Sequence, residues 1–284
     1  MNHVRRSPSA LNSVLTTEEE IDYEHITGIT NSHLDLDRPC GYIREGKHLF
    51  NDPIAVLCLE RLVFMASEEE KRWIIGRKRF YGGIGAHDAI AGARRARIFD
   101  DSVNRFITGN PPCTVINLGC GFDTRFWRIE NRDCRYVEID LPEVVALKRE
   151  ILKDKLGYEL FGCSVLDASW IDQVTANGNS RFLLLAEGLF PYLPKPDVIQ
   201  LFQQLAQRFV RSQLVFDTVP EKWTKGIWKS LLRLHSRLDF GLDVSWVFGI
   251  KNPRDIESYA PGLRVLGHVK ASGGPIISVS INAA

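Results

Sequence analysis

Short apolar runs recur through the second half of the chain, and segments with helical spacing of apolar residues separate them. The runs predict five buried strands, at 115–118, 135–140, 160–166, 181–187 and 213–217. The run at 181–187 is apolar through its centre, which is typical of a parallel strand covered by helices on both faces. The segments between them predict helices over 123–130, 142–156, 168–175 and 195–211. This alternation predicts an α/β fold with a doubly wound, mostly parallel sheet.

The two flanks of this alternation have a different pattern. Upstream, apolar residues recur at helical spacing between 52 and 77, and a second helix is predicted over 88–107. Downstream, the runs 263–269 and 275–281 predict an antiparallel pair of strands. This pair brings the predicted sheet to seven strands, with helices before it and a helical insert ahead of its last two strands.

We predict three parts for the chain: a mobile N-terminus over 1–20, a helical cap over 21–94 and an α/β domain over 95–284. An insert over 220–261 interrupts the α/β domain, and we interpret it as a lid. Its large apolar residues are Trp223, Trp228, Leu231, Leu232, Phe240, Trp246 and Phe248. They either pack the insert on its host domain or form a pocket wall for an apolar or aromatic substrate, since ligand pockets are lined by such side chains.

Composition narrows the classes of function. The chain of 284 residues has a net charge of +1, which provides no bulk attraction to nucleic acid. It has no run of about eighteen apolar residues, so we expect no membrane span, and its N-terminus lacks the apolar core of a secretion signal. The six cysteines lack the close paired spacing of zinc and redox sites. We therefore expect no metal and a reduced, cytoplasmic setting.

Candidate chemistry begins where the first predicted strand ends. Gly119 and Gly121 form a tight glycine turn directly after this strand, and Asp140 ends the next strand about twenty residues later. An acid at this distance from such a turn typically holds the hydroxyls of an adenosine ribose. The pattern therefore predicts an adenosyl cofactor at the tip of a parallel sheet. The alternative role for Asp140 is to cap the helix that follows Pro142.

The turn differs from the dinucleotide-binding fingerprint at its third glycine. Thr124 stands at that position, and Asp123 precedes it. The third glycine leaves room for a pyrophosphate, and a carboxylate beside the helix N-terminus would repel that group. S-adenosylmethionine has no phosphate, and two glycines leave room for its methionine part. The sequence therefore predicts S-adenosylmethionine, with a nicotinamide-dependent oxidoreductase as a remote alternative.

Two more strand ends add acids to the same edge of the predicted sheet. Asp167, after Leu166, follows the third strand and is expected to address the adenine amino group; the alternatives are a helix cap for Asp167 and a core position for Leu166. Glu187 ends the fourth strand, at the edge where open α/β sheets bind ligands. The remaining predicted cofactor contacts are Cys120, Asp123 and Leu141.

Three segments resemble the leucine carboxyl methyltransferase family: 117–125 (NLGCGFDTR), 138–144 (EIDLPEV) and 186–193 (AEGLFPYL). They resemble most closely its branch named after the tetracenomycin polyketide O-methyltransferase. The resemblance implies a class I, Rossmann-like methyltransferase fold. It also implies that an arginine on the helix before the first strand binds the cofactor's carboxylate. The matching positions are Arg95, which is our first choice, and Arg97; a solvent-facing helical patch is the alternative.

The predicted catalytic residues are Glu187 and Tyr192. We expect Glu187 to hold the cofactor's ammonium group and to face the reacting methyl, and Tyr192 to shape the acceptor site unless its turn is only structural. A carboxylate acceptor is already ionised near neutral pH, whereas a phenol with a pKa of about 10 benefits from a general base. His87 and His235 are candidates for such a base, but neither lies in a matched motif. The missing base favours a carboxyl acceptor.

Taken together, these residues predict an O-methyltransferase that transfers a methyl group from S-adenosylmethionine to a small-molecule carboxylate or hydroxyl by in-line displacement. Methylation of a protein or peptide C-terminal carboxylate is the nearest alternative. A non-catalytic binding module with the same fold is another alternative, which the intact Gly119, Gly121, Asp140 and Glu187 disfavour.

Overall fold

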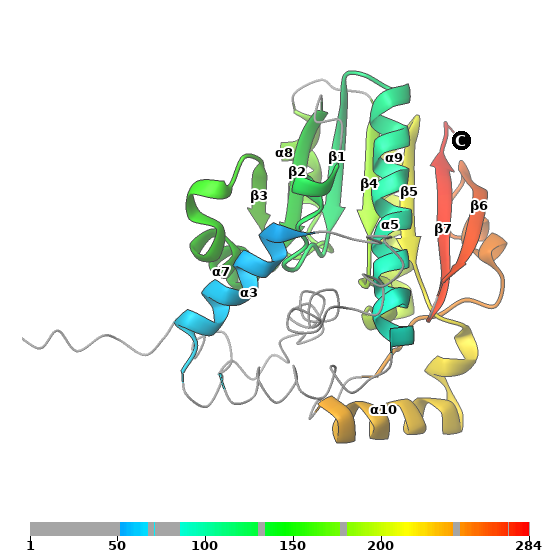
Figure 1. The fold of residues 1–284 in the computed structure, drawn as a ribbon. Coiled ribbons are helices and arrows are strands. Elements are labelled where there is room, and N and C mark those ends of the chain that lie inside the picture. The colour runs from blue at the N-terminus through cyan, green and yellow to red at the C-terminus, as the bar shows by residue number, and fades with distance from the viewer. Residues whose placement is uncertain are drawn as a thin grey trace, which may run out of the picture.

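The computed structural model describes residues 52–67, 71, 86–129, 134–176, 181–240, 245–271 and 273–283, with backbone alone for 86–91 and 235–240. The N-terminus predicted over 1–20 and most of the helical cap predicted over 21–94 lie outside the described residues. The described part consists of an α/β domain with helix α3 (Pro53–Met65) beside it (Figure 1).

One sheet of seven strands forms the centre of the domain, in the order β3-β2-β1-β4-β5-β7-β6. The strands are β1 (Cys113–Leu118), β2 (Cys134–Asp140), β3 (Glu159–Gly162), β4 (Phe182–Ala186), β5 (Ser212–Asp217), β6 (Leu263–Ala271) and β7 (Gly274–Ile281). Strands β1 to β5 pair in parallel, and β7 lies antiparallel to both β5 and β6. The prediction of a doubly wound, mostly parallel sheet of seven strands is confirmed.

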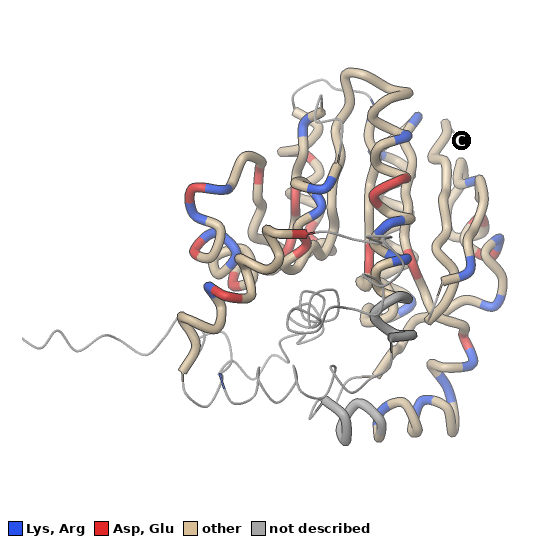
Figure 2. The backbone as a smooth tube through the Cα atoms, viewed as in Figure 1, with Lys and Arg blue, Asp and Glu red and all other residues tan. Residues whose placement is uncertain are grey.

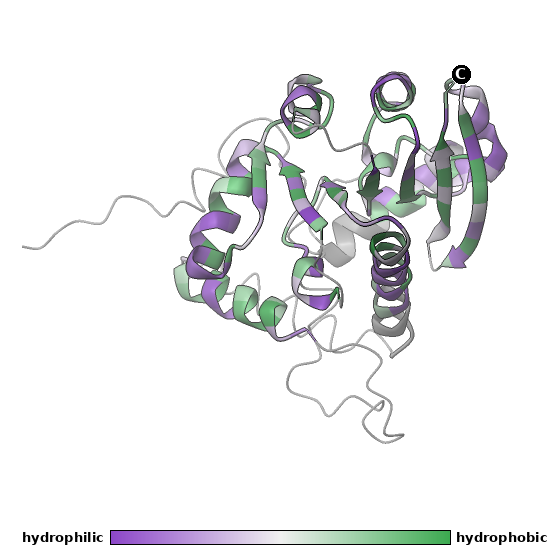
Figure 3. Ribbon diagram, turned by 90° about the horizontal axis from the view of Figure 1, so that it is seen from above, coloured by the Kyte–Doolittle hydropathy of each residue, from purple (hydrophilic) through white to green (hydrophobic). Residues whose placement is uncertain are grey.

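Helices cover both faces of this sheet. Helices α8 (Ser169–Thr175) and α9 (Lys195–Arg208) lie on one face, and α5 (Ala86–Gly109) and α7 (Pro142–Leu152) lie on the other (Figure 3). Because β1 to β5 are parallel, their carboxyl ends meet at one edge of the sheet. This edge is where an open α/β sheet binds its ligands.

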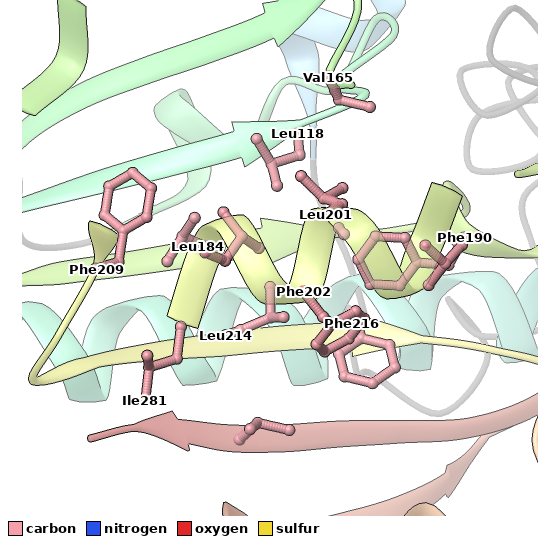
Figure 4. Packing of buried hydrophobic residues seen from close by; sticks show 14 of the residues in the cluster. Leu118, Val165, Leu184, Phe190, Leu201, Phe202, Phe209, Leu214, Phe216 and Ile281 are labelled. Carbon is pink, nitrogen blue, oxygen red and sulfur yellow. The ribbon is translucent and has the colours of Figure 1, made fainter. Parts of the chain in front are cut away.

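The core has two halves because successive side chains of a strand point to opposite faces. Ile116 and Leu184 belong to the half under α8 and α9, whereas Val115 and Leu183 belong to the half under α5. Figure 4 shows side chains of β4, β5 and α9 filling the first half, among them Leu184 and Phe202. Every residue of β1 and β4 is buried, which explains the unbroken apolar run of β4, whereas β1 also contains the buried polar residues Thr114 and Asn117.

Two elements are shorter than the apolar pattern predicts. The strand predicted at 160–166 corresponds to β3, which stops earlier because a turn follows: the Asp167 N–H donates to the Ser164 carbonyl oxygen at 3.0 Å. The helix predicted over 123–130 is the single turn α6 (Arg125–Arg128). The apolar periodicity did not predict how short α6 is, because side-chain ion pairs hold α6 in place rather than a long apolar stripe.

Two helices stop earlier than predicted because the residue after each has left the helical conformation. The helix predicted over 142–156 ends as α7 before Lys153, whose φ is 41°. The helix predicted over 195–211 ends as α9 at Arg208, and the next residue, Phe209, has left the helical conformation with a φ of −114° and a ψ of 51°. An α-helix does not continue through such a residue.

The predicted insert over 220–261 has two unlike halves. The short helix η4 (Glu221–Thr224) and helix α10 (Gly226–Phe240) lie beyond the carboxyl edge of the sheet, at the bottom of Figure 1. The second half returns to the domain, where Phe248 is buried in the core under α9 and the short helix η5 (Pro253–Ser258) packs on β6. The lid assignment stays a prediction, and the first half has the position that a lid would need.

Candidate functional site

The glycine turn and Asp140 meet at the carboxyl edge of the sheet. Gly119 and Gly121 have φ values of 61° and 47°, in the left-handed region that favours glycine. The Gly121 N–H donates to Asp140 Oδ2 at 2.6 Å, and the Leu141 N–H donates to Asp140 Oδ1 at 2.7 Å. These bonds fix the carboxylate of Asp140 against the turn. Each carboxylate oxygen has a second lone pair, so both can still accept a ligand hydroxyl.

Asp123 follows the turn and points into the protein. Its Oδ1 accepts from the Arg125 N–H at 2.9 Å and from Arg128 Nη2 at 3.2 Å. Its Oδ2 accepts from Asn117 Nδ2 at 2.9 Å and pairs with Arg125 Nη1. Burial alone would raise the pKa of Asp123, but Arg125 and Arg128 outweigh it and hold that pKa well below its usual range. Both carboxylate oxygens are therefore committed to groups of the protein.

Thr124 occupies the position of the third fingerprint glycine and links the turn to α3. It is 2% exposed, and its hydroxyl donates to Asp52. The same hydroxyl oxygen accepts from Arg128 Nη1 at 2.9 Å. Asp52 also accepts from the Ala55 N–H at 2.9 Å and so caps the start of α3. A glycine at position 124 could not make this link.

The two arginines of α6 are buried among carboxylates. Arg125, with a side chain 1% exposed, donates from Nε to Asp100 Oδ1 at 2.8 Å and from Nη2 to Glu187 Oε2 at 2.6 Å, and it also pairs with Asp123. Arg128 pairs with Asp100 at 2.8 Å and with Asp52 at 2.7 Å. Burial alone would lower the pKa of Arg125, but Asp123, Glu187 and Asp100 raise it well above its ordinary value.

Glu187 lies just beyond β4 and has a different arginine on each carboxylate oxygen. Arg125 holds Oε2, and Arg95 of α5 donates from Nε to Oε1 at 2.8 Å. Arg95 Nη1 also lies 3.4 Å from Asp217 Oδ2, at the end of β5. Arg97 lies elsewhere: its side chain is 64% exposed and pairs with Asp101 on the outer surface of α5. Of the two predicted arginines, the structure therefore brings Arg95 to the sheet edge.

These contacts form one ion cluster, in which basic and acidic segments lie side by side in Figure 2. We define it as Arg95, Arg125, Arg128, Asp52, Asp100, Asp123, Glu187 and Asp217. Among the described residues, five carboxylates thus face three guanidinium groups. Burial raises the pKa of Asp217, and neighbouring Glu187 adds to this, as expected for surplus negative charge. Within the described residues, the cluster therefore contains more negative than positive charge.

A second buried ion pair lies beneath the glycine turn. Lys148 Nζ donates to Glu138 Oε2 at 2.5 Å and to the Asp123 carbonyl oxygen at 2.8 Å. It also lies 3.8 Å from Cys120 Sγ. Glu138 and Lys148 are 0% and 1% exposed, and burial raises the pKa of Glu138 although Lys148 opposes it. The predicted contact residue Cys120 is thus a buried thiol packed on this pair.

Asp167 and Leu166 lie in the turn between β3 and α8. Asp167 is exposed, and its Oδ1 accepts from the Ser169 N–H at 2.9 Å, at the start of α8. The Leu166 N–H donates to Ser164 Oγ at 3.2 Å, and its side chain packs against the core under α8 and α9. Asp167 therefore supports the helix start, and its exposure leaves a contact with a ligand open.

Tyr192 lies in the short helix η3 (Phe190–Tyr192), just after Glu187, and contacts the returning half of the insert. The Trp246 indole N–H donates to the Tyr192 hydroxyl at 3.1 Å. Trp246 also stacks on Trp223, with ring centroids 5.7 Å apart and planes 21° apart. Tyr192, Trp223 and Trp246 therefore form one aromatic group, and Tyr192 follows Glu187 closely in the chain. The side chains of the candidate bases His87 and His235 lie outside the described residues.

Sequence reasoning missed most of the ion cluster. Asp52, Asp100 and the neighbouring pair Arg125 and Arg128 stand in three separate parts of the chain, and each alone resembles an ordinary surface charge. The burial of Lys148 could have been predicted, because Lys148 lies on the same helical stripe as the buried residues Val144 and Ile151. A charged residue in such a stripe predicts a buried partner, since burying an unpaired charge is very unfavourable.

The described residues lack two further features. No helix there has both the length and the apolar character to cross a membrane. The same residues hold no cluster of three or more His, Cys, Asp or Glu side chains arranged to bind a metal ion.

Comparison with known proteins identifies relatives of one kind. The chain is 33% identical over 171 residues to the tetracenomycin polyketide synthesis O-methyltransferase TcmP of Streptomyces glaucescens, a match that covers 60% of each chain. It is 28% identical over 188 residues to the S-adenosyl-L-methionine-dependent methyltransferase dpfgK of Gibberella zeae, covering 61% of this chain and 60% of that one. The chain therefore spans about 60% of the length of these relatives.

A more distant match is to leucine carboxyl methyltransferase 1 of Bos taurus, 28% identical over 109 residues, which covers 36% of this chain and 30% of that protein. Residues 43–206, more than half of the chain, match the family described as leucine carboxyl methyltransferase. All three segments noted in the sequence lie within this range, together with every member of the ion cluster except Asp217. The chain therefore belongs to the leucine carboxyl methyltransferase family.

Proposed function

We propose that the protein is an S-adenosylmethionine-dependent O-methyltransferase that acts on a small-molecule carboxylate or hydroxyl. The observation that carries the proposal is the meeting of the glycine turn, Asp140 and the acidic ion cluster at one edge of the sheet. Membership of a methyltransferase family and the printed names of the relatives support it.

The residues at this edge fit the chemistry of the cofactor. Gly119 and Gly121 would admit the methionine part close to the backbone, and Asp140 would accept from the ribose hydroxyls. Arg95 would bind the carboxylate, and Glu187 the ammonium group. When bound, S-adenosylmethionine supplies an electrophilic methyl group on a sulfonium. The surplus of carboxylates in the ion cluster suits its net positive charge.

We assign several of the predicted contact residues to supporting roles. Asp123 would hold Arg125 and Arg128, because both of its oxygens are already bonded to protein groups. Cys120 would pack beneath the turn on Lys148. Leu141 keeps its place beside Asp140, where its backbone N–H holds the carboxylate. We propose Arg95 rather than Arg97 as the partner of the cofactor's carboxylate.

For the acceptor, we propose a metabolite with an apolar or aromatic part. Tyr192, Trp223 and Trp246 would form one wall of its site, next to Glu187. TcmP is named for the methylation of a polyketide, which supports a small-molecule acceptor. The match to leucine carboxyl methyltransferase 1 favours a second candidate, methylation of a protein C-terminal carboxylate. Both use an oxygen acceptor, and the carboxylate needs no base.

We also propose that the protein works in a reducing compartment such as the cytoplasm. The described cysteines Cys58, Cys113, Cys120, Cys134 and Cys163 are all free thiols. Burial raises the pKa of Cys58 to about 11 and that of Cys120 well above its usual value. Such thiols are unreactive and pack as small apolar groups.

Calorimetry tests the proposal with the cofactor and with its demethylated product, S-adenosylhomocysteine. We expect both to bind the wild-type protein, and Asp140→Ala to abolish measurable binding while the melting temperature stays close to that of the wild type. Asp154→Ala is the matched control, because its side chain is 70% exposed. A wild-type protein that is folded and binds neither compound at millimolar concentration would overturn the proposal. Incubation of cell extract with methyl-labelled cofactor would then identify the acceptor.

A further inference from the structure

The carboxylate of Glu187 is shared between two arginines that differ greatly in burial. Arg125 on Oε2 has a side chain 1% exposed and is held by Asp100 and Asp123, with its guanidinium carbon 5.3 Å from the centre of the Phe99 ring. Arg95 on Oε1 has a side chain 35% exposed, at the open edge of the site. One partner of Glu187 is therefore enclosed by the protein, while the other is partly open to solvent.

The pair of Arg95 and Glu187 presents a positive and a negative charge side by side. A zwitterionic amino acid group presents the complementary two charges. If such a ligand binds, its ammonium group can replace Arg95 on Oε1, and its carboxylate can take the released guanidinium. One internal ion pair then becomes two intermolecular pairs, and no charge is left unpaired in a partly buried site. Asp217, 3.4 Å from Arg95 Nη1, would keep Arg95 close during this exchange.

We propose that Arg95 and Glu187 form an internal ion pair that the amino acid part of the cofactor replaces, and that Arg125 is the positioning residue that holds Glu187 in place throughout. This inference rests on the proposed function and assigns Arg125 a role in it. Arg125 does not touch the ligand. It acts by keeping Glu187 Oε2 anchored, so that Oε1 alone changes its partner.

The exchange predicts opposite effects for two ligands on one variant. The first ligand is S-adenosylhomocysteine. The second is its analogue that lacks the carboxylate and keeps the ammonium group. The analogue must break the Arg95–Glu187 pair in the wild-type protein and gives Arg95 no new partner. In Arg95→Gln no pair has to be broken, so the analogue should bind about threefold to tenfold more tightly than to the wild type, the scale of one ion pair.

The same variant should bind S-adenosylhomocysteine about tenfold more weakly, because its carboxylate loses its charged partner. Arg105→Gln is the matched control, since Arg105 is an exposed arginine on the same helix, and it should leave both affinities unchanged. If Arg95→Gln lowers the affinity for the analogue or leaves it unchanged, Arg95 is not exchanged for the ammonium group and the inference is wrong. If the wild type binds neither ligand, the proposed function fails instead.

A second variant tests Arg125. Lysine cannot reproduce the planar fork of arginine, so Arg125→Lys should release Glu187. The affinity for S-adenosylhomocysteine should then fall about tenfold or more. It should leave 5′-methylthioadenosine unaffected, because this ligand lacks the amino acid part. Arg128→Lys is the comparison, since Arg128 shares Asp100 and Asp123 with Arg125, and it should change the two affinities in parallel.

Equal weakening of both ligands by Arg125→Lys would mean that Arg125 only supports the fold, and unchanged binding would mean that it has no role. If this variant does not fold, Asp100→Asn takes its place, because it removes one anchor of Arg125 and keeps the shape of the side chain. It should shift the ratio of the two affinities in the same direction by a smaller factor. An unchanged ratio in folded Asp100→Asn would overturn the role of Arg125.

Discussion

The two sides of the proposed site differ in the interactions that they contain. On the cofactor side, the ion cluster ties together α3, α5, α6 and the ends of β4 and β5, and its inner member Arg125 is almost fully buried. On the acceptor side, α10 carries large apolar residues that are at least half exposed, among them Trp228 at 51% and Leu231 at 50%. One side is cross-linked by charge, whereas on the other side, among the described residues, α10 contacts mainly the short helix η4.

This difference matches two separate requirements of the proposed reaction: a donor held in a fixed position, and an acceptor site that can vary. A methyl transfer needs a fixed donor, because the reacting atoms must be held in line. Ion pairs and charge-assisted hydrogen bonds fix groups in direction as well as distance. The acceptor differs from enzyme to enzyme, and a loosely attached helix can change its residues at little cost to the fold. The predictions that follow test this division, beginning with the rigid side.

The largest effect is expected at the buried pair beneath the glycine turn. Lys148→Met leaves Glu138 buried without its cation, which should lower the free energy of unfolding by about 3–5 kcal/mol. Urea unfolding at neutral pH measures this change in the free energy of unfolding. Lys155→Met, at a side chain 47% exposed, is the control. The double variant Glu138→Gln with Lys148→Met should recover much of the loss. A loss below about 1 kcal/mol in the single variant would show that this side is not held by charge.

A smaller effect with a clear pH dependence is expected at Asp123. Its pKa in the folded protein is held well below the value of about 3.9 in the unfolded chain. The stabilisation is therefore present above about pH 4 and is lost as the pH falls toward the folded pKa. Asp123→Asn should cost about 2 kcal/mol at pH 7 and should flatten the decline of stability between about pH 5 and 3.

Chemical denaturation at several pH values checks this, with Asp154→Asn as the exposed control. A variant whose stability declines as steeply as that of the wild type over this pH range would contradict the role of Asp123 in holding the arginines. In that case the acid-sensitive group would lie elsewhere in the ion cluster.

The same contrast explains what could be predicted from the sequence. The strand β4 was predictable because burial on both faces leaves an unbroken apolar run, and the glycine turn was predictable because its spacing is local. Asp123 was interpreted as a cofactor contact because it follows the glycine turn in the sequence. Its actual partners Arg128 and Asn117 could not be recognised, since the sequence of the turn does not show which side chains meet in the fold. The contact of Arg125 with Glu187 joins residues 62 positions apart, and no periodic pattern records such a pair.

On the acceptor side, we expect a change in substrate handling without a change in cofactor binding. Trp246→Phe keeps an aromatic ring on Trp223 and removes the N–H that donates to the Tyr192 hydroxyl. A hydrogen bond of this kind contributes about 1 kcal/mol, so label transfer to the acceptors in cell extract should fall about fivefold. The Kd for S-adenosylhomocysteine should stay the same. A matching rise in that Kd would mean that the aromatic wall belongs to the cofactor site.

The smallest effect is expected on α10 itself. Leu231 is half exposed, so Leu231→Gln should change the free energy of unfolding by no more than about 0.5 kcal/mol. The matched comparison is Leu201, which is 1% exposed on α9 and lies in the core shown in Figure 4. Leu201→Ala should cost about 3 kcal/mol, because it leaves a cavity among packed side chains. Urea unfolding of both variants measures the contrast. A loss at Leu231 that approached the loss at Leu201 would show that α10 is packed in solution, and the acceptor side would then be as firmly built as the cofactor side.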